Sequence, residues 1–373
     1  MRYDSKEFTV LFAAGGTGGH LFPAIAIAEE IRKVRPETRI AFVGTRKKLE
    51  ARVVPQKGFS FYTIWISGLH RRLTAENLLF PAKVVVSLVQ SFFLMKKIQP
   101  DIVVGTGGYV CGPILFVASL MKIPTVVHES NSYPGVTTRL VASRVTKVFL
   151  TFEITRKWLP ALDAGKIELV GNPTRESLGS VSREEGLKYF GLTPAKKTLF
   201  VFGGSLGAAS INAAMEKIVA KLGAEGIQVI WQTGENDLQR FESAGAGYGW
   251  VGEFIDTMEY AYAAADVVMC RAGATTIAEL TRLGKPAILV PYPHAAANHQ
   301  EFNARAMVEA GAAISIPDSD LETGAVAAIR GLMQNDTLRR TMCEESLRLG
   351  KPNAGKDIAQ RILDLAPEHA ENR

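Results

Sequence analysis

Short runs of apolar residues alternate along this chain with longer segments in which apolar side chains recur every three or four positions. Short apolar runs bounded by turn residues are typical of strands buried on both faces of a parallel sheet, and the longer spacing is typical of helices. Helices are expected at 22–34, 211–222 and 351–365. Strands are expected at 8–14, 40–43, 61–64, 102–104, 125–128, 148–150, 198–202, 228–231, 267–270, 287–290 and 313–316.

The order of strand, glycine turn and helix occurs near the start of the chain and again near its middle, at 8–34 and at 198–222. This repetition predicts an α/β protein with two doubly wound, Rossmann-like domains rather than one long sheet. The sequence Gly-Asn-Pro-Thr at 171–174 is the expected break, because Pro restricts the residue before it and Gly-Asn favours a turn. We expect one domain over 1–172 and another over 173–350.

Glycine clusters follow three of the predicted strands, at 15–19, 105–108 and 203–207. A strand, a glycine turn and a helix together form an anion pocket, because backbone N–H groups and the positive end of the helix dipole converge there. The clusters therefore predict phosphorylated ligands.

Composition narrows the protein class. The chain has 373 residues, of which 47% are hydrophobic and 21% charged, as in a folded α/β protein with two cores. Its net charge of +6 favours anionic partners and leaves nucleic acid, an anionic membrane surface and sugar nucleotides open. The three cysteines have no CxxC spacing, which predicts a reducing cytoplasm with neither disulfides nor zinc. The apolar run at 8–14 is too short for a secretory signal.

Commoner phosphate-binding motifs fit poorly. The first cluster lacks the third glycine of a dinucleotide fingerprint, and no carboxylate follows the second strand. Arg46, Lys47 and Lys48 at that position suit a 2′-phosphate, so an NADP-dependent oxidoreductase stays open. The absence of a G-x-x-x-x-G-K-[ST] motif excludes the P-loop NTPases.

The second half of the chain carries a more specific set of side chains at predicted strand ends, where ligands of open α/β sheets bind. Ser205 and nearby N–H groups suit a diphosphate, and Arg175 can neutralise it. Glu279 can accept hydrogen bonds from both ribose hydroxyls, and the backbone near Ile255 can contact a planar base. Gln300, with Asn298, suits sugar hydroxyls or an acetamido group.

The chain resembles the MurG family in motifs that occur in the family's order, from Thr9 to about Leu365. They are GGTGGH, GTGGYVCGP, HESN, GNPTR, GGSLGA, QTGEND, CRAGATTIAEL and HAAANHQ. The resemblance implies a GT-B glycosyltransferase with a cleft between its domains and with the last helix packed on the first domain. The implied reaction moves GlcNAc from UDP-GlcNAc to undecaprenyl-diphospho-MurNAc-pentapeptide in peptidoglycan synthesis, at the cytoplasmic face of the bacterial plasma membrane. It implies no nucleic acid, no cofactor, and other cell-wall synthesis proteins as further partners.

The resemblance also implies site residues. The expected donor site comprises Thr17, Gly18, Gly19, Asn131, Arg175, Ser205, Ile255, Ala274, Thr275, Thr276, Glu279 and Gln300. The segment at 293–300 is one residue longer than the family pattern, which leaves His299 as the rival of Gln300. The first two clusters, lacking nucleotide-reading residues nearby, are expected to hold the acceptor's diphosphate opposite that of the donor. The expected acceptor site comprises Gly16, Gly105, Thr106, Gly107, Gly108, Tyr109, His128 and Glu129.

Transfer with inversion needs one in-line displacement, a base for the acceptor hydroxyl and stabilised charge on departing UDP. His20 is the expected base, because an imidazole has an unperturbed pKa of about 6.5, and His128 and Glu129 are its rivals. The one D-x-D match, at 318–320, is expected to cap a helix. With Arg175 and helix dipoles available for the diphosphate, no metal is predicted.

The most apolar stretch of the chain, at 78–95, is interrupted by polar residues and is not expected to span a membrane. Basic residues flank it at 71–72 and 96–97, so it is expected to lie on an anionic surface with Leu78, Leu79 and Phe80 inserted. The alternative, a core helix, is retained for its C-terminal half. A UDP-sugar epimerase and, less favoured, the NADP enzyme remain alternative functions. A purely structural lipid-binding protein is disfavoured, because it would have no use for the ligand-binding side chains predicted in the second half of the chain.

Overall fold

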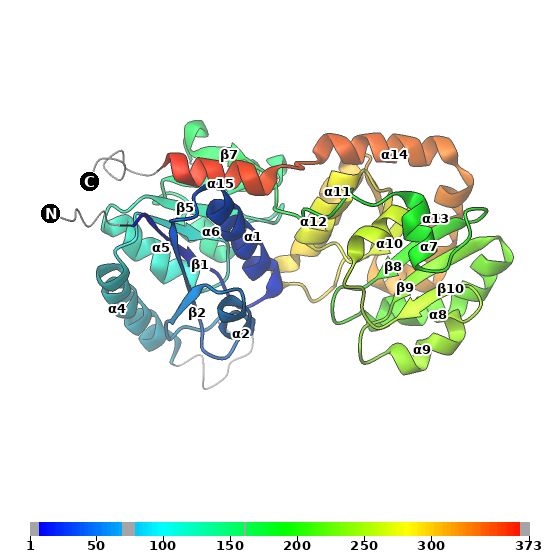
Figure 1. Ribbon diagram of the computed structural model, residues 1–373, viewed down its shortest axis with the longest axis horizontal. Coiled ribbons are helices and arrows are strands. Elements are labelled where there is room, and N and C mark those ends of the chain that lie inside the picture. Colours follow the sequence, from blue (N-terminus) through cyan, green and yellow to red (C-terminus); the bar gives the residue numbers. More distant parts are fainter. Residues whose placement is uncertain (1–6, 69–78, 160–161, 366–373) are drawn as a thin grey trace. The chain divides into compact units, whose positions relative to one another are not determined.

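The computed structural model describes residues 7–68, 79–159 and 162–365, which form two compact units (Figure 1). The N-terminal unit comprises Met1–Pro173 together with Asn353–Arg373, and the C-terminal unit comprises Thr174–Pro352. Each unit has its own parallel sheet with helices on both faces. The predicted pair of Rossmann-like domains is therefore confirmed.

The N-terminal unit contains a seven-stranded parallel sheet in the order β3-β2-β1-β4-β5-β6-β7. Its central strands are apolar on both faces, because alternate side chains enter two separate cores. The strands are β1 (Thr9–Ala13), β2 (Arg39–Gly44), β3 (Ser60–Thr63), β4 (Ile102–Gly105), β5 (Thr125–Glu129), β6 (Lys147–Leu150) and β7 (Ile167–Leu169).

Helices cover both faces of this sheet. On one face lie α1 (Gly18–Val34), α2 (Leu49–Gln56) and α15 (Ala354–Asp364), and on the other α4 (Phe80–Ile98), α5 (Cys111–Leu120) and α6 (Val136–Val141). The last helix, α15, packs Ile358, Ala359 and Ile362 into the core beside α1, and Arg361 pairs with Glu168 next to it. The end of the chain thus belongs to the N-terminal unit.

The C-terminal unit contains a six-stranded parallel sheet in the order β10-β9-β8-β11-β12-β13. Its strands are β8 (Lys197–Phe202), β9 (Ile227–Gln232), β10 (Gly249–Gly252), β11 (Val267–Cys270), β12 (Ala287–Leu289) and β13 (Ala313–Ser315). Its helices are α7 (Arg183–Tyr189), α8 (Ala209–Ala224), α9 (Leu238–Gly245), α10 (Met258–Ala264), α11 (Ala274–Leu283), α12 (His299–Glu309), α13 (Leu321–Gln334) and α14 (Asp336–Leu349).

Every strand predicted from an apolar run is present, and two edge strands were missed. β7 has the sequence Ile-Glu-Leu, and β10 begins and ends with glycine. Edge strands need to bury less surface than central ones, so they leave a weaker apolar signal in the sequence.

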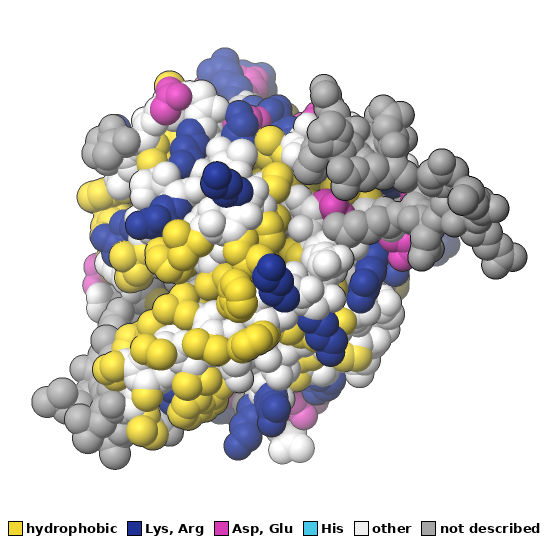
Figure 2. All heavy atoms as spheres, turned by 90° about the vertical axis from the view of Figure 1, so that its left-hand side faces the viewer, with side chains coloured by type: hydrophobic (Ala, Val, Ile, Leu, Met, Phe, Trp, Pro, Cys, Tyr) yellow, Lys and Arg dark blue, Asp and Glu magenta, His cyan; other side chains and the backbone are white. Residues whose placement is uncertain are grey.

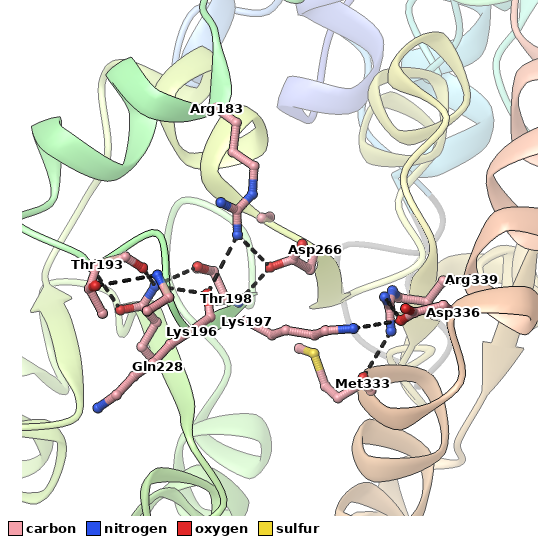
Figure 3. A network of polar contacts seen from close by, with 12 residues as sticks. Arg183, Thr193, Lys196, Lys197, Thr198, Gln228, Asp266, Met333, Asp336 and Arg339 are labelled. Carbon is pink, nitrogen blue, oxygen red and sulfur yellow. Dashed lines mark hydrogen bonds and ion pairs between the residues drawn. The ribbon is translucent and has the colours of Figure 1, made fainter.

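Ion pairs and hydrogen bonds tie together the amino-terminal edge of the C-terminal sheet (Figure 3). Asp266, just before β11, accepts from Arg183 (3.0 Å) and from the Thr198 amide at the start of β8 (2.7 Å). Lys197 pairs with Asp336 at the start of α14 (2.6 Å). These charged and polar groups are thus paired with one another by hydrogen bonds and ion pairs. The third glycine cluster, at 203–207, lies at the opposite, carboxyl-terminal edge of the sheet.

Candidate functional site

In the N-terminal unit the first and second glycine clusters meet at the ends of the paired strands β1 and β4. His20, in the first turn of α1, lies directly over Gly107, where an added Cβ would be 2.3 Å from His20 Nδ1. Gly107 also has a φ of 112°, which disfavours any side chain. The Thr106 hydroxyl donates to the His20 carbonyl (2.8 Å). The expected base and the expected acceptor cluster are thus packed together.

Glu50, which the sequence analysis did not select, holds the first cluster in place. Its carboxylate is fully buried and accepts from the Gly16 amide (3.2 Å), the Thr45 amide (3.0 Å) and the Thr45 hydroxyl (2.8 Å). The Tyr109 ring lies against Gly16, and burial, with Glu50 as a smaller cause, raises the pKa of Tyr109. No motif marks Glu50, because its contact with the first cluster is to the backbone of Gly16, 34 residues away in the sequence.

His128 and Glu129 have structural tasks at the end of β5. His128 is fully buried with Nε2 2.8 Å from the Gly171 carbonyl, and burial lowers its pKa. Glu129 accepts from the Asn131 and Gly135 amides (3.0 and 2.9 Å) and from a neighbouring threonine hydroxyl. Neither side chain has the accessible surface that a general base or an acceptor contact requires, so those roles stay predictions without support.

The predicted sugar contacts of this unit lie around the same loops. Thr17 occupies the N-cap of α1 and is exposed, and Gly18 and Gly19 form the first turn of the helix. Asn131 is half-buried, with its amide group held by Glu129 (3.3 Å). Their part in sugar binding stays a prediction.

In the C-terminal unit the third cluster links β8 to α8. Gly207 has a φ of 76°, and an added Cβ would lie 2.0 Å from the Thr233 carbonyl, so a side chain does not fit there. Ser205 is exposed at the tip of the turn, as a phosphate contact requires. This loop presents backbone groups at the start of a long helix.

Glu279 and Arg175 come together in this unit, as the sequence predicts. Glu279 on α11 is 5% exposed, accepts from Tyr262 Oη (2.9 Å) and lies 3.8 Å from Arg175 Nε. Burial raises the pKa of Glu279, and the Arg175 charge and the Tyr262 hydrogen bond partly oppose that rise. Arg175 remains half-exposed and also donates to the Asp256 carbonyl (3.3 Å). A guanidinium thus stands between a buried carboxylate and solvent.

Gln232, also missed, connects two predicted contacts. Its side-chain oxygen accepts from the Ile255 amide (2.9 Å) and its nitrogen donates to the Gly204 carbonyl (3.0 Å). The loop expected to contact a base is therefore fastened to the loop expected to hold a diphosphate. Because its amide is already engaged, Ile255 offers its carbonyl rather than its N–H to a ligand.

The remaining predicted donor residues follow β11 and β12. Ala274, Thr275 and Thr276 form the first turn of α11, where N–H groups point out of the helix. Gln300 accepts from the Tyr292 amide (2.9 Å), and His299 Nδ1 lies 2.7 Å from the Ala296 carbonyl. Both side chains help to shape their loop, so the choice between them as the sugar contact stays a prediction.

Arg271 fastens that loop to the sheet. It donates to the Val290 and Pro291 carbonyls (3.2 and 3.3 Å) and to Ser210 Oγ (2.8 Å), and it pairs with Asp318. The prediction that the D-x-D segment caps a helix is wrong for Asp318, because its carboxylate forms an ion pair with Arg271 instead of capping a helix. Asp320 occupies the N-cap of α13, but its side chain caps no amide. Within the described parts of the chain, no group of three His, Cys, Asp or Glu residues is arranged to hold a metal.

Residues 10–150 match the glycosyltransferase family 28 N-terminal domain and residues 198–362 match its C-terminal domain. A UDP-N-acetylglucosamine–N-acetylmuramyl-(pentapeptide) pyrophosphoryl-undecaprenol N-acetylglucosamine transferase from Salinibacter ruber is 42% identical, covering 97% of this chain and 98% of that protein. The relative of the same name from Chlorobaculum tepidum is 45% identical, covering 96% of this chain and 99% of its own.

Two solved structures show how widely this fold is used. The crystal structure of Acinetobacter baumannii MurG matches 96% of this chain and 99% of its own, with a TM-score of 0.76 and 27% identity. A UDP-N-acetylglucosamine 2-epimerase matches with a TM-score of 0.63 and 16% identity, covering 99% of this chain and 98% of its own, a likeness of fold alone. The GT-B architecture is confirmed, and full-length identity above 40% shows that this chain belongs to the MurG family of glycosyltransferases.

Proposed function

We propose that this chain joins GlcNAc from UDP-GlcNAc to undecaprenyl-diphospho-MurNAc-pentapeptide, forming the lipid-linked disaccharide precursor of peptidoglycan. The observation that carries the proposal is similarity over almost the whole chain to transferases named for this reaction. The epimerase alternative has only a likeness of fold in its favour. The chemistry of both units fits a transferase that handles two diphosphates.

In the C-terminal unit, the proposed donor site neutralises the diphosphate of UDP-GlcNAc. Arg175 supplies a positive charge, and the third glycine cluster and the first turn of α11 supply N–H groups. Glu279, buried beside Arg175, is suited to accept from the ribose hydroxyls. As the bond between the sugar and the phosphate breaks, the electron pair leaves with UDP, and these groups stabilise the developing charge.

In the N-terminal unit, the first two glycine clusters are proposed to hold the acceptor's diphosphate, with His20 as general base. The acceptor hydroxyl attacks the anomeric carbon of GlcNAc from the face opposite UDP, and its proton passes to the imidazole of His20. The position of His20 supports this role, because its side chain is only partly buried and lies against Gly107 of the second cluster. The side chain of His128, in contrast, is fully buried.

We place this reaction at the cytoplasmic leaflet of an anionic membrane. One side of α4 exposes Val85, Val89, Phe92 and Phe93, and Lys96 and Lys97 follow at its end. Figure 2 shows hydrophobic side chains gathered on this face of the N-terminal unit with Lys and Arg around them. Such a surface suits insertion of apolar side chains among acyl chains and pairing of cations with anionic lipids. In the described ranges no helix has the length and apolar character to cross a bilayer.

The exposed apolar surface extends further along the helix than the sequence analysis expected. Leu79 is 51% exposed, Phe80 is only half-exposed, and Leu78 lies outside the described residues. The core role retained for the C-terminal half is confirmed for Met95, which packs into the core beneath the sheet. It is wrong for Phe92 and Phe93, which are 43% and 65% exposed.

Incubation with UDP-GlcNAc labelled in the sugar, with and without lipid acceptor, tests the function. Transfer of the label to the lipid, and UDP release only when acceptor is present, are expected. The Arg175→Ala variant should lose most of this activity, whereas the matched control Lys217→Ala, a surface cation of the same unit, should retain it. An isomerised UDP-sugar formed without acceptor would refute the transferase.

Co-sedimentation with vesicles containing anionic lipid tests the membrane contact. The Val89→Asp/Phe93→Asp variant should bind at least tenfold more weakly, because burying two such side chains stabilises by a few kcal/mol. The control Val308→Asp/Leu338→Asp changes exposed apolar residues of the C-terminal unit and should bind normally. Equal binding by both variants would contradict the assignment of this surface.

A further inference from the structure

A pocket of about 510 Å³ opens in the N-terminal unit beside the first glycine cluster. It lies where β2 and β3 end, between the loop that enters α2 and one side of α4. Its volume falls within the usual range for small-molecule sites. No residue assigned to the donor site lines it.

Three consecutive cations, Arg46, Lys47 and Lys48, form the rim of this pocket. All three are exposed, and within the described ranges no carboxylate makes an ion pair with them. Glu50 follows closely in sequence, but its carboxylate is turned inward to Gly16 and Thr45. Among the described residues, the rim therefore offers positive charge that no carboxylate neutralises.

The other side of the pocket is apolar and fixed in position. Ile64 and Ile66 are buried beneath it, and Trp65 between them is 48% exposed. The Trp65 amide donates to Gln90 Oε1 on α4 (2.7 Å), and Lys83 donates to Ser67 Oγ (2.9 Å). Because α4 holds this segment at two points, the pocket is formed before any ligand binds.

The pocket adjoins the proposed acceptor site. Tyr109 directly follows the second glycine cluster and lines the pocket, and its ring lies against Gly16 of the first cluster. Glu50 joins the Thr45 wall of the pocket to the same Gly16. A ligand whose diphosphate occupies the clusters thus has this pocket within reach of its other parts.

Resting on the proposed function, we infer that this pocket binds the peptide of the acceptor through its carboxylates. The glycine clusters suit the diphosphate, and a polyprenyl chain carries no charge that would use three cations. The peptide carries the remaining anionic groups of the acceptor. Cationic side chains pair with its carboxylates, while Trp65 and Ile66 contact its apolar parts.

Two acceptors with the same short prenyl diphosphate test this inference on the full chain. One has a pentapeptide with free carboxylates, and in the other every peptide carboxylate is a carboxamide. The wild-type KM should be about tenfold higher for the amidated acceptor, with kcat unchanged, because charge-assisted pairs are lost from binding. Arg46→Ala/Lys47→Ala should raise the KM of the free-carboxylate acceptor to the value for the amidated one and leave the latter unchanged.

The double variant Lys188→Ala/Lys221→Ala, which removes the same charge from exposed sites of the C-terminal unit, should behave as wild type. Equal wild-type KM values for the two acceptors, or an equal rise for both in Arg46→Ala/Lys47→Ala, would overturn the inference. With a third acceptor that carries a longer prenyl chain, a KM that depends on prenyl length and not on peptide charge would assign the pocket to the lipid and also overturn the inference. Wild-type enzyme that transfers GlcNAc to neither acceptor would instead refute the proposed function, and the inference with it.

Discussion

Replacing Glu50 with glutamine should destabilise the N-terminal unit by about 3 kcal/mol. The carboxylate is fully buried and accepts three hydrogen bonds, from Gly16 N, Thr45 N and Thr45 Oγ1. The amide oxygen of glutamine can retain the two bonds to Thr45, but its NH₂ group then faces the Gly16 N–H. One charge-assisted bond is lost and one buried donor is left unpaired, each costing roughly 1–3 kcal/mol.

Calorimetry measures the effect on stability. A loss of about 3 kcal/mol should lower the Tm of the transition assigned to the N-terminal unit by about 6–12 °C. The matched control is Glu30→Gln in α1, which removes a carboxylate that is also buried but pairs with the exposed Lys33. That change should cost at most about 1 kcal/mol.

Kinetics separate a local effect from general unfolding. At a temperature where the Glu50→Gln variant is folded, its kcat/KM for acceptor should fall at least tenfold, because Gly16 belongs to the proposed acceptor cradle. Its Kd for UDP should stay at the wild-type value, because Arg175, Ser205 and Glu279, the residues proposed for the diphosphate and the ribose, lie in the C-terminal unit. A Tm within 2 °C of wild type together with unchanged acceptor kinetics would refute the reasoning.

Three further predictions concern His128, Glu279 and Arg271. Burial lowers the pKa of His128, so the unfolded state binds more protons than the folded state below pH 6.5. The Tm should therefore fall as the pH drops through that range, and His128→Gln should flatten the dependence of Tm on pH. Burial raises the pKa of Glu279, so the affinity for UDP-GlcNAc, measured by calorimetric titration, should weaken as the pH falls towards that raised pKa. Glu279→Gln should bind UDP-GlcNAc roughly tenfold more weakly at neutral pH. The affinity of this variant should not depend on pH in that range. Arg271→Lys cannot make all four contacts, so the Gln300 loop should loosen and raise the KM for UDP-GlcNAc more than the inhibition constant of UDP. A flat Tm profile in wild type, a retained pH dependence in Glu279→Gln, or an equal rise of both constants would contradict these three expectations.

The local pattern of the sequence predicted the fold because each central strand must be apolar on both faces, whatever the partners of its side chains. Glycines were equally visible, since positions such as Gly107 and Gly207 tolerate no side chain. Arg175 and Glu279 were found because a cation and a carboxylate at strand ends have a chemical use there. The missed strands β7 and β10 lie at sheet edges, where this constraint is weakest.

The sequence by itself therefore determined two Rossmann-like domains, their glycine turns and the charged groups beside them. Only the tertiary structure decided which polar side chains hold those turns, namely Glu50, Gln232 and Arg271. Each has at least one partner on a different loop or strand, and no residue-type pattern encodes such contacts. The enclosure of His128 and the pocket behind the Arg46–Lys48 rim were decided in the same way, because burial and empty volume arise only when separate elements pack together.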